Sequence, residues 1–151
     1  MRKVIFSLLF LTAININLIA QEDGKSEMPI NEQIQSVKNE SDTLVILWTS
    51  GDPDVALKMV FMYAHAAVKN SWWNEINLIV WGPSSKLTSE NIDIQKKIAE
   101  MQSVGIKVEA CKACADQYGV ADKLIELGIE VKYMGKALTE IIKSNKKLVT
   151  F

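Results

Sequence analysis

The only two cysteines of the 151-residue chain are Cys111 and Cys114, in the stretch VEACKACADQYGV (residues 108–120). They stand between an apolar run typical of a strand and the expected start of a helix. Two thiols at this spacing are able to form a disulfide, hold a metal, exchange electrons or carry sulfur. A metal site is not expected within one chain, because His65 is the only histidine and the spacing matches no common zinc motif.

The sequence around the pair favours reactive thiols over a structural disulfide. Backbone amides and the dipole at a helix start stabilise an anion, so they would favour the thiolate, which is the nucleophile in cysteine chemistry. A disulfide between Cys111 and Cys114 would close only a short ring, and stabilisation through the unfolded chain grows with loop length. A structural disulfide stays open as an alternative, since an oxidising compartment would let it form and persist.

Strands and helices are expected to alternate along the chain from residue 43. Buried apolar runs predict the strands, and helical spacing with capping signals predicts the helices. The expected strands are 43–49, 75–81, 106–110, 129–134 and 146–151, and the expected helices are 53–70, 89–104, 113–127 and 136–145. This alternation with short connections predicts a single flavodoxin-like α/β domain, with a mainly parallel five-stranded sheet and helices on both faces.

The cysteines fall where such a fold collects its chemistry. Ligands of an open parallel sheet bind outside the carboxyl ends of the strands. Four loops are expected there: 50–52, 82–85, 111–114 and 133–135. Beside the catalytic candidates Cys111 and Cys114, these loops supply the candidate substrate-binding residues Gly51, Asp52, Gly82, Tyr133, Met134 and Gly135. The segment TSGDP is able to hold an anion, although an ordinary capped helix start is the favoured interpretation.

Composition and the first residues indicate an exported protein. The chain is 48% hydrophobic with a formal net charge of −1, so no basic excess points to nucleic acid. Residues 1–20 have the basic start, apolar stretch and small final residue of a secretory signal peptide, with cleavage expected after Ala20. An uncleaved anchor is less favoured, because the apolar stretch is short for a membrane span. Residues 21–42 are expected to form a polar leader and 43–151 the domain, in a periplasmic or secreted protein without a stable membrane anchor.

The expected helix 53–70 has more apolar surface than packing on one sheet requires. At about 100° per residue, a narrow polar face holds Asp54, Lys58, His65 and Lys69. The wide apolar arc that remains is expected to form a subunit interface, with cover by the polar leader as the alternative. His65 is better explained as a solvated helix residue than as a catalytic base.

Four segments carry a resemblance to a known family: VILWTSGDPDVALKMVFMYA, LIVWGPS, GIKVEACKACADQYGV and LGIEVKYMGKALTE. Over residues 43–151 the chain resembles the DsrE/DsrF-like family, also described as YchN-like. The most specific element of that family is a cysteine at the end of the third strand, eight residues before the glycine of a Gly-Val pair. Cys111 and the pair Gly119-Val120 match this pattern.

The resemblance implies a flavodoxin-like fold, assembly into trimers or hexamers, and sulfur transfer. It implies that Cys111 carries sulfane sulfur as a persulfide, and Cys114 is then expected to resolve or release it. A sulfur donor or acceptor protein, or a small sulfur compound, would be the partner, and no cofactor is expected. Relay members of the family work in the cytosol, so their relay function does not transfer directly to an exported chain. Two alternatives are a thiol–disulfide oxidoreductase using the same pair and a non-catalytic oligomeric module that binds a small ligand.

Overall fold

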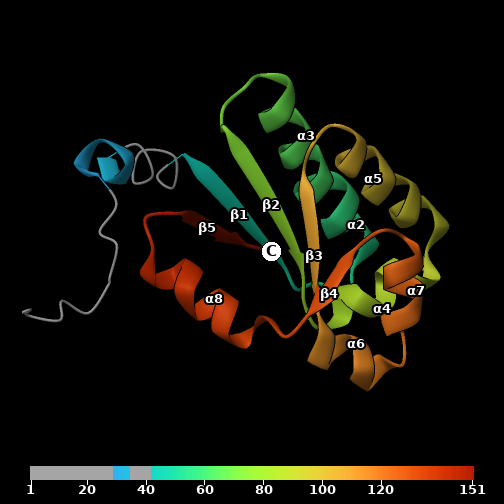
Figure 1. Cartoon of the computed structure of the whole chain (residues 1–151). Helices are drawn as coiled ribbons and strands as arrows, with labels where there is room; N and C mark the ends of the chain where they lie inside the picture. Colours follow the sequence, from blue (N-terminus) through green and yellow to red (C-terminus); the bar gives the residue numbers. More distant parts are fainter. Residues whose placement is uncertain (1–28, 35–41) are drawn as a thin grey trace, which may run out of the picture.

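The computed structural model of the protein describes residues 29–34 and 42–151 (Figure 1). The expected signal peptide at 1–20 and most of the expected leader at 21–42 lie outside the described residues. Residues 30–34 form a short helix in which Ile30 and Ile34 are exposed. Within the described part of the chain, no helix is long and apolar enough to cross a membrane.

A parallel five-stranded sheet forms the centre of the domain (Figure 1). Its order is β4-β3-β2-β1-β5, and each neighbouring pair runs parallel. The strands are β1 (Thr43–Trp48), β2 (Glu75–Val80), β3 (Lys107–Cys111), β4 (Glu130–Lys132) and β5 (Lys147–Thr150). The expected α/β fold is confirmed, and the common strand direction puts all carboxyl ends at one edge of the sheet.

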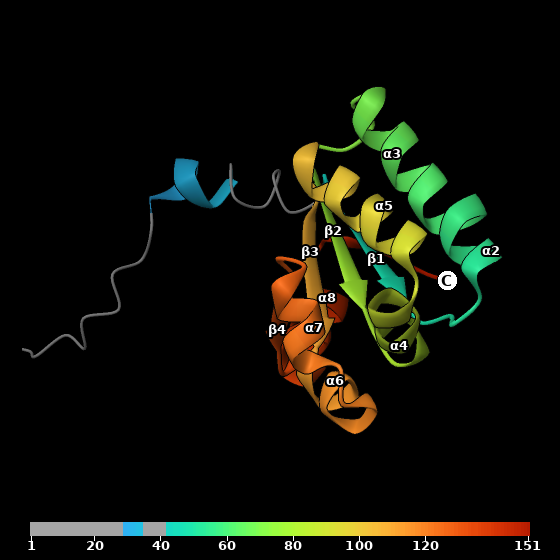
Figure 2. The same ribbon diagram turned by 90° about the vertical axis from the view of Figure 1, so that its right-hand side faces the viewer.

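Helices cover the two faces of the sheet unequally. The helical elements are α2 (Pro53–Val55), the π-helical η1 (Ala56–Val60), α3 (Phe61–Lys69), α4 (Pro83–Glu90), α5 (Ile92–Ser103), α6 (Lys112–Tyr118), α7 (Ala121–Glu126) and α8 (Met134–Lys143). The continuous segment α2-η1-α3 and α5 lie on one face (Figure 2). Helix α8 lies on the opposite face, where it connects β4 to β5.

The structure corrects three expectations about the helices. Pro83–Glu90 forms α4, whereas the sequence predicts a helix only from residue 89; a proline in the first turn is a usual helix start. The expected helix 113–127 is divided into α6 and α7, because Gly119 ends α6 in the left-handed conformation with φ 66°. The expected helix 53–70 contains the π-helical turn η1, which rotates the faces of α3 relative to those of α2.

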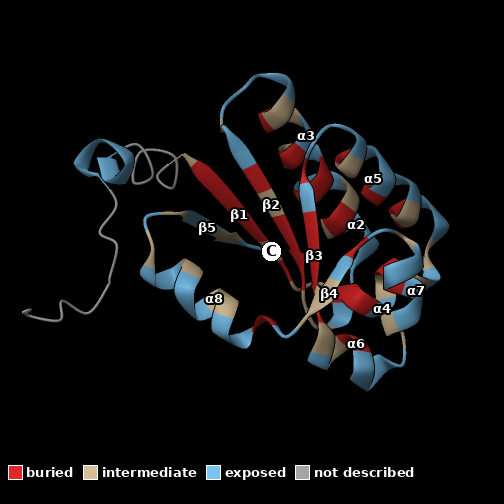
Figure 3. Ribbon diagram, in the orientation of Figure 1, coloured by how far each residue is buried: buried red, intermediate tan, exposed pale blue. Residues whose placement is uncertain are grey.

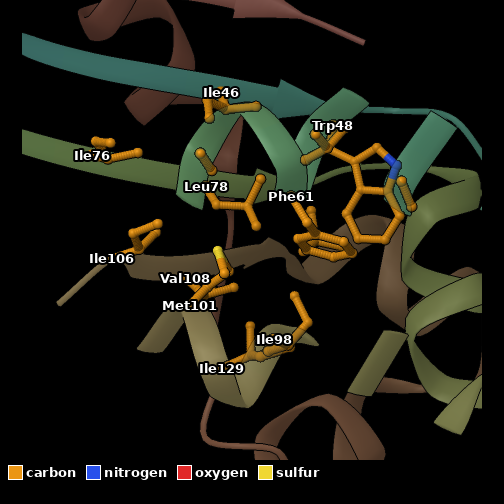
Figure 4. Close-up of a cluster of buried hydrophobic side chains, with 14 of the residues drawn as sticks. Ile46, Trp48, Phe61, Ile76, Leu78, Ile98, Met101, Ile106, Val108 and Ile129 are labelled. Atoms are coloured by element: carbon orange, nitrogen blue, oxygen red, sulfur yellow. The ribbon is translucent and has the colours of Figure 1, made fainter. Parts of the chain in front are cut away.

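Alternate strand residues build two separate hydrophobic cores. The larger one lies under α2-η1-α3, α5 and α7 (Figure 4), where the rings of Trp48 and Phe61 meet edge to face with centroids 5.4 Å apart. The smaller core lies under α8 and is built from Val45, Ile79, Cys111 and Met134. Buried residues concentrate in β1, β2 and β3, whereas α8 and β5 keep most of their surface exposed (Figure 3).

Candidate functional site

Cys111 is the last residue of β3 and faces α8. The preceding residue, Ala110, belongs to the larger core on the other face, so the alternation of the strand directs Cys111 into the smaller core. There it shares a cluster with Val45, Ile79 and Met134 and is only 3% exposed. The cysteine that matches the family pattern is therefore a buried residue.

Cys114 lies in the first turn of α6 and turns back toward Cys111. Its thiol is hydrogen-bonded to the sulfur of Cys111 and accepts a hydrogen bond from the backbone N–H of Gly82. Both cysteines are free thiols, and Cys114 keeps part of its surface exposed. Three of the predicted site residues therefore lie together at the ends of β2 and β3: Gly82, Cys111 and Cys114.

The environment of Cys114 favours its neutral form. Burial raises the pKa of the Cys114 thiol and the hydrogen bond with Cys111 raises it further, whereas the Gly82 amide lowers it. The net shift is upward. This is opposite to the shift expected from a place at a helix start, because the loss of water around the sulfur outweighs the amide. Cys114 is consequently a hydrogen-bond donor to Cys111 at neutral pH.

A glycine with a positive φ and a buried serine fix the loop that contacts Cys114. Gly82 has φ 69° and ψ −133°, a conformation that residues with a side chain rarely adopt. The buried Ser84 hydroxyl donates to the carbonyl of Trp48 at 2.7 Å and accepts from the backbone N–H of Trp81 at 2.9 Å. These bonds tie the ends of β1 and β2 together beside the cysteine pair.

The loop after β4 lies on the same side of the sheet as Cys111. Met134 is 1% exposed and belongs to the cluster of Cys111, whereas Tyr133 is 69% exposed. The Lys112 ammonium lies 5.6 Å from the centroid of the Tyr133 ring and pairs with the Asp116 carboxylate at 2.7 Å. Its hydrogen bond with Asp116 raises the pKa of Lys112. A cation and an aromatic ring therefore lie at the surface next to the thiols.

Of three other predicted binding residues at the same edge, Asp52 and Gly51 have structural roles. Asp52 caps α2, since its carboxylate accepts a hydrogen bond from the backbone N–H of Asp54 at 2.8 Å. At Gly51 a Cβ would lie 3.1 Å from the Cβ of Pro83, so glycine lets these two loops approach closely. Gly135 lies in the first turn of α8 and has open space around its Cα.

His65 lies far from the thiols. It is exposed on α3 and lines a groove of about 460 Å³ between α3 and α5. Because α3 and Cys111 lie on opposite faces of the sheet, His65 is not available as a base for the cysteines, in agreement with its interpretation as a solvated residue.

Across 29–34 and 42–151, no three His, Cys, Asp or Glu side chains gather as a metal site would require.

A charged cluster beside the thiols was missed in the sequence. Glu109 is 3% exposed, accepts a hydrogen bond from Asn77 at 2.7 Å and pairs with Lys107 and Lys132. Burial raises the pKa of Glu109, but the hydrogen bonds from Lys107, Lys132 and Asn77 outweigh it and lower the pKa to about 2. The sequence signal for this cluster is a pair of opposite charges two positions apart in each strand: Lys107 and Glu109 in β3, and Glu130 and Lys132 in β4.

The chain belongs to the DsrE/DsrF-like family, whose model matches residues 42–151. A conserved protein of unknown function from Bacteroides thetaiotaomicron is 42% identical, with a TM-score of 0.71 over 73% of this chain and 95% of that chain. The crystal structure of the YchN protein from E. coli matches at 18% identity and a TM-score of 0.53, over 73% of this chain and 99% of that chain. A search of curated proteins found no match.

These comparisons confirm the resemblance seen in the sequence. The likeness to YchN is a likeness of fold, since its sequence identity is low. Membership of the DsrE/DsrF-like family suggests a function of the sulfur-relay type.

Proposed function

We propose that this chain handles sulfane sulfur, with Cys111 carrying it as a persulfide and Cys114 acting as the resolving thiol. The contact between two free thiols at the carboxyl edge of a DsrE/DsrF-like domain carries this proposal. The family supplies the expectation of sulfur relay, and the contact gives the matching cysteine a second thiol within reach.

Loading transfers one sulfur atom without net oxidation. The Cys111 thiolate attacks the sulfane sulfur of a persulfide or polysulfide donor. The S–S bond of the donor breaks, and the donor leaves as a thiolate, a shorter polysulfide or, when the donor is thiosulfate, sulfite. A new S–S bond joins the transferred sulfur to Cys111 Sγ.

Release reduces the transferred sulfur. The Cys114 thiolate attacks Sγ of Cys111, the bond from that atom to the outer sulfur breaks, and hydrosulfide leaves. The two cysteines lose two electrons as their disulfide forms, and the outer sulfur gains those two electrons. An external thiol must then reduce the disulfide before a second cycle.

The experiment that tests the proposal is intact mass after treatment with polysulfide or thiosulfate, followed by tryptic mapping. Cleavage after Lys107 and Lys112 puts Cys111 in peptide 108–112 and Cys114 in peptide 113–123. We expect the protein to gain one sulfur on peptide 108–112, and Cys111→Ser to gain none there. No gain from any donor, with both thiols reduced and open to alkylation, would contradict sulfur carriage.

The same thiol contact favours a second candidate, a thiol–disulfide oxidoreductase. In that case the pair moves electrons rather than sulfur. A Cys111–Cys114 disulfide that exchanges readily with external thiols but never gains sulfur would establish this function. A reduction potential far below those of exchange catalysts would instead identify a structural disulfide.

We also propose that the chain is exported and works as a homo-oligomer. The signal-peptide layout of residues 1–20 supports export. Assembly is supported by large apolar side chains that are exposed in η1, in α3 and just after α3: Met59 (48%), Met62 (63%) and Trp72 (54%).

A further inference from the structure

We infer that Cys114 is the first acceptor of sulfur and that Cys111 receives the sulfur from Cys114. This inference rests on the proposed function and concerns the order in which the same two thiols act. In the simplest scheme for the family pattern, the matching cysteine would take sulfur directly from the donor. The geometry of this chain points to an added transfer inside the pair.

The burial of Cys111 is the first argument. A donor must bring its sulfur into bonding distance of the attacking thiolate, so reactivity depends on access. Cys111 is 3% exposed and shares a closely packed cluster with Val45, Ile79 and Met134. Cys114 keeps part of its surface exposed. A donor larger than a few atoms therefore reaches Cys114 first.

The surroundings of Cys114 give the second argument. The backbone N–H of Gly82 donates to Cys114 Sγ. Although burial and Cys111 favour the thiol form of Cys114 overall, this amide bonds the sulfur whenever it is an anion, first as the nucleophile and then as the leaving group. A first acceptor has to serve in both ways, because it attacks the donor and is then expelled by the second thiol. The position of Gly82 is fixed by the loop bonds of Ser84.

The contact between the thiols supplies the transfer step. The Cys111 thiolate attacks the outer sulfur of the Cys114 persulfide. The bond from that sulfur to Cys114 Sγ breaks, a bond to Cys111 Sγ forms, and Cys114 leaves as a thiolate that takes up the proton given up by Cys111. Nothing is oxidised or reduced overall. The sulfur ends in the less accessible position, and Cys114 is free for the release step.

Two matched variants and two donors of different size test this order. Cys111→Ser and Cys114→Ser each keep one thiol with a similar shape, and circular dichroism checks that both fold. Loading is followed by rapid quenching and tryptic mapping, with inorganic polysulfide as the small donor and glutathione persulfide as the larger one. We expect Cys111→Ser to collect sulfur on peptide 113–123 at close to the wild-type rate. In Cys114→Ser we expect loading of Cys111 by glutathione persulfide to fall about tenfold or more.

The outcomes separate this inference from the proposed function. If Cys114→Ser loads at the wild-type rate with both donors and Cys111→Ser gains nothing, the order is wrong while sulfur carriage stands. If the wild-type protein gains no sulfur either, the proposed function fails and the order fails with it. A measurement on the unchanged protein adds a check against misfolding: a bulky maleimide should label peptide 113–123 well before peptide 108–112, and equal labelling would overturn the accessibility argument.

Discussion

The backbone N–H of Gly82 donates a hydrogen bond to the sulfur of Cys114, and so joins the loop after β2 to the first turn of α6. The helices α4 and α5 and the strand β3 separate these two residues along the chain. The contact depends on the unusual backbone of Gly82, with φ 69° and ψ −133°. The loop after β2 therefore influences the pKa of Cys114 through a backbone N–H and not through an ionisable side chain.

Replacing this glycine tests the contact. Gly82→Ala should lower the free energy of unfolding by about 1–3 kcal/mol, because alanine is strained in this conformation although no atom blocks its Cβ. Any shift of the amide also removes the bond that lowers the pKa of Cys114, so the pKa should rise further. Urea unfolding and the pH dependence of alkylation of peptide 113–123 measure the two effects. Gly135→Ala is the control, since this helical glycine has room for a methyl group. An unchanged alkylation profile in Gly82→Ala would argue against the amide contact.

Cys114 should react slowly with iodoacetamide at neutral pH. Burial and the hydrogen bond with Cys111 raise the pKa of Cys114, so the thiolate becomes abundant only above the pH range of an ordinary cysteine. Cys111→Ala removes one of these causes and should move the rate profile of Cys114 to lower pH. The urea-unfolded protein gives the reference profile for the same peptide. A native profile at or below that reference would show that the thiolate, and not the thiol, is favoured at this site.

Glu109 should stabilise the fold through its two lysine partners, and this stabilisation should disappear in acid. Its pKa is lowered from 4.5 to about 2, so the contribution is complete above about pH 4.5 and is lost as the pH falls toward 2. Glu109→Gln should therefore lower the free energy of unfolding by roughly 2–3 kcal/mol at pH 7 and by progressively less in acid. Urea unfolding of both proteins at several pH values gives the difference directly.

Glu130 provides a matched control for this cluster. It pairs with the same two lysines, Lys107 and Lys132, but its side chain is 50% exposed. Glu130→Gln should consequently cost less than about 1 kcal/mol, as exposed ion pairs usually do. Equal losses in the Glu109 and Glu130 variants would mean that burial adds nothing to the pairing.

Much of the fold could be predicted because its signals are local. The run that became β1 is apolar from Leu44 to Trp48, and in β2 only Asn77 interrupts the apolar residues after Glu75. Asp52 followed by Pro53 is a direct helix-start signal. The end of α6 was also predictable from the sequence, because Gly119 is the kind of residue that adopts the left-handed conformation at a helix end. It was missed because the apolar spacing continues on both sides of that glycine.

The site was predictable only in part, because its details depend on contacts between distant residues. Topology alone places Cys111 and Gly82 at the same edge of the sheet. The sequence gives no sign that Cys111 would be buried under α8 while Cys114 stays partly exposed, since both follow from how α8 crosses the sheet. The sequence also does not show that burial raises the pKa of Cys114 by more than the Gly82 amide lowers it. Both effects depend on which groups surround each sulfur in the folded chain.

The exposed apolar side chains of the first helical segment should be covered in solution by a second copy of the chain. Met62 is 63% exposed and lies near the groove between α3 and α5, so a charge there costs the isolated domain little but would be buried in an interface. Met62→Glu should therefore reduce the mass measured by light scattering after size exclusion, with an unchanged circular dichroism spectrum. Lys136→Glu, whose side chain is 90% exposed on α8 at the other face, is the control and should leave the mass unchanged. A monomeric wild-type protein, or an assembly that survives Met62→Glu unchanged, would show that this surface is not the interface.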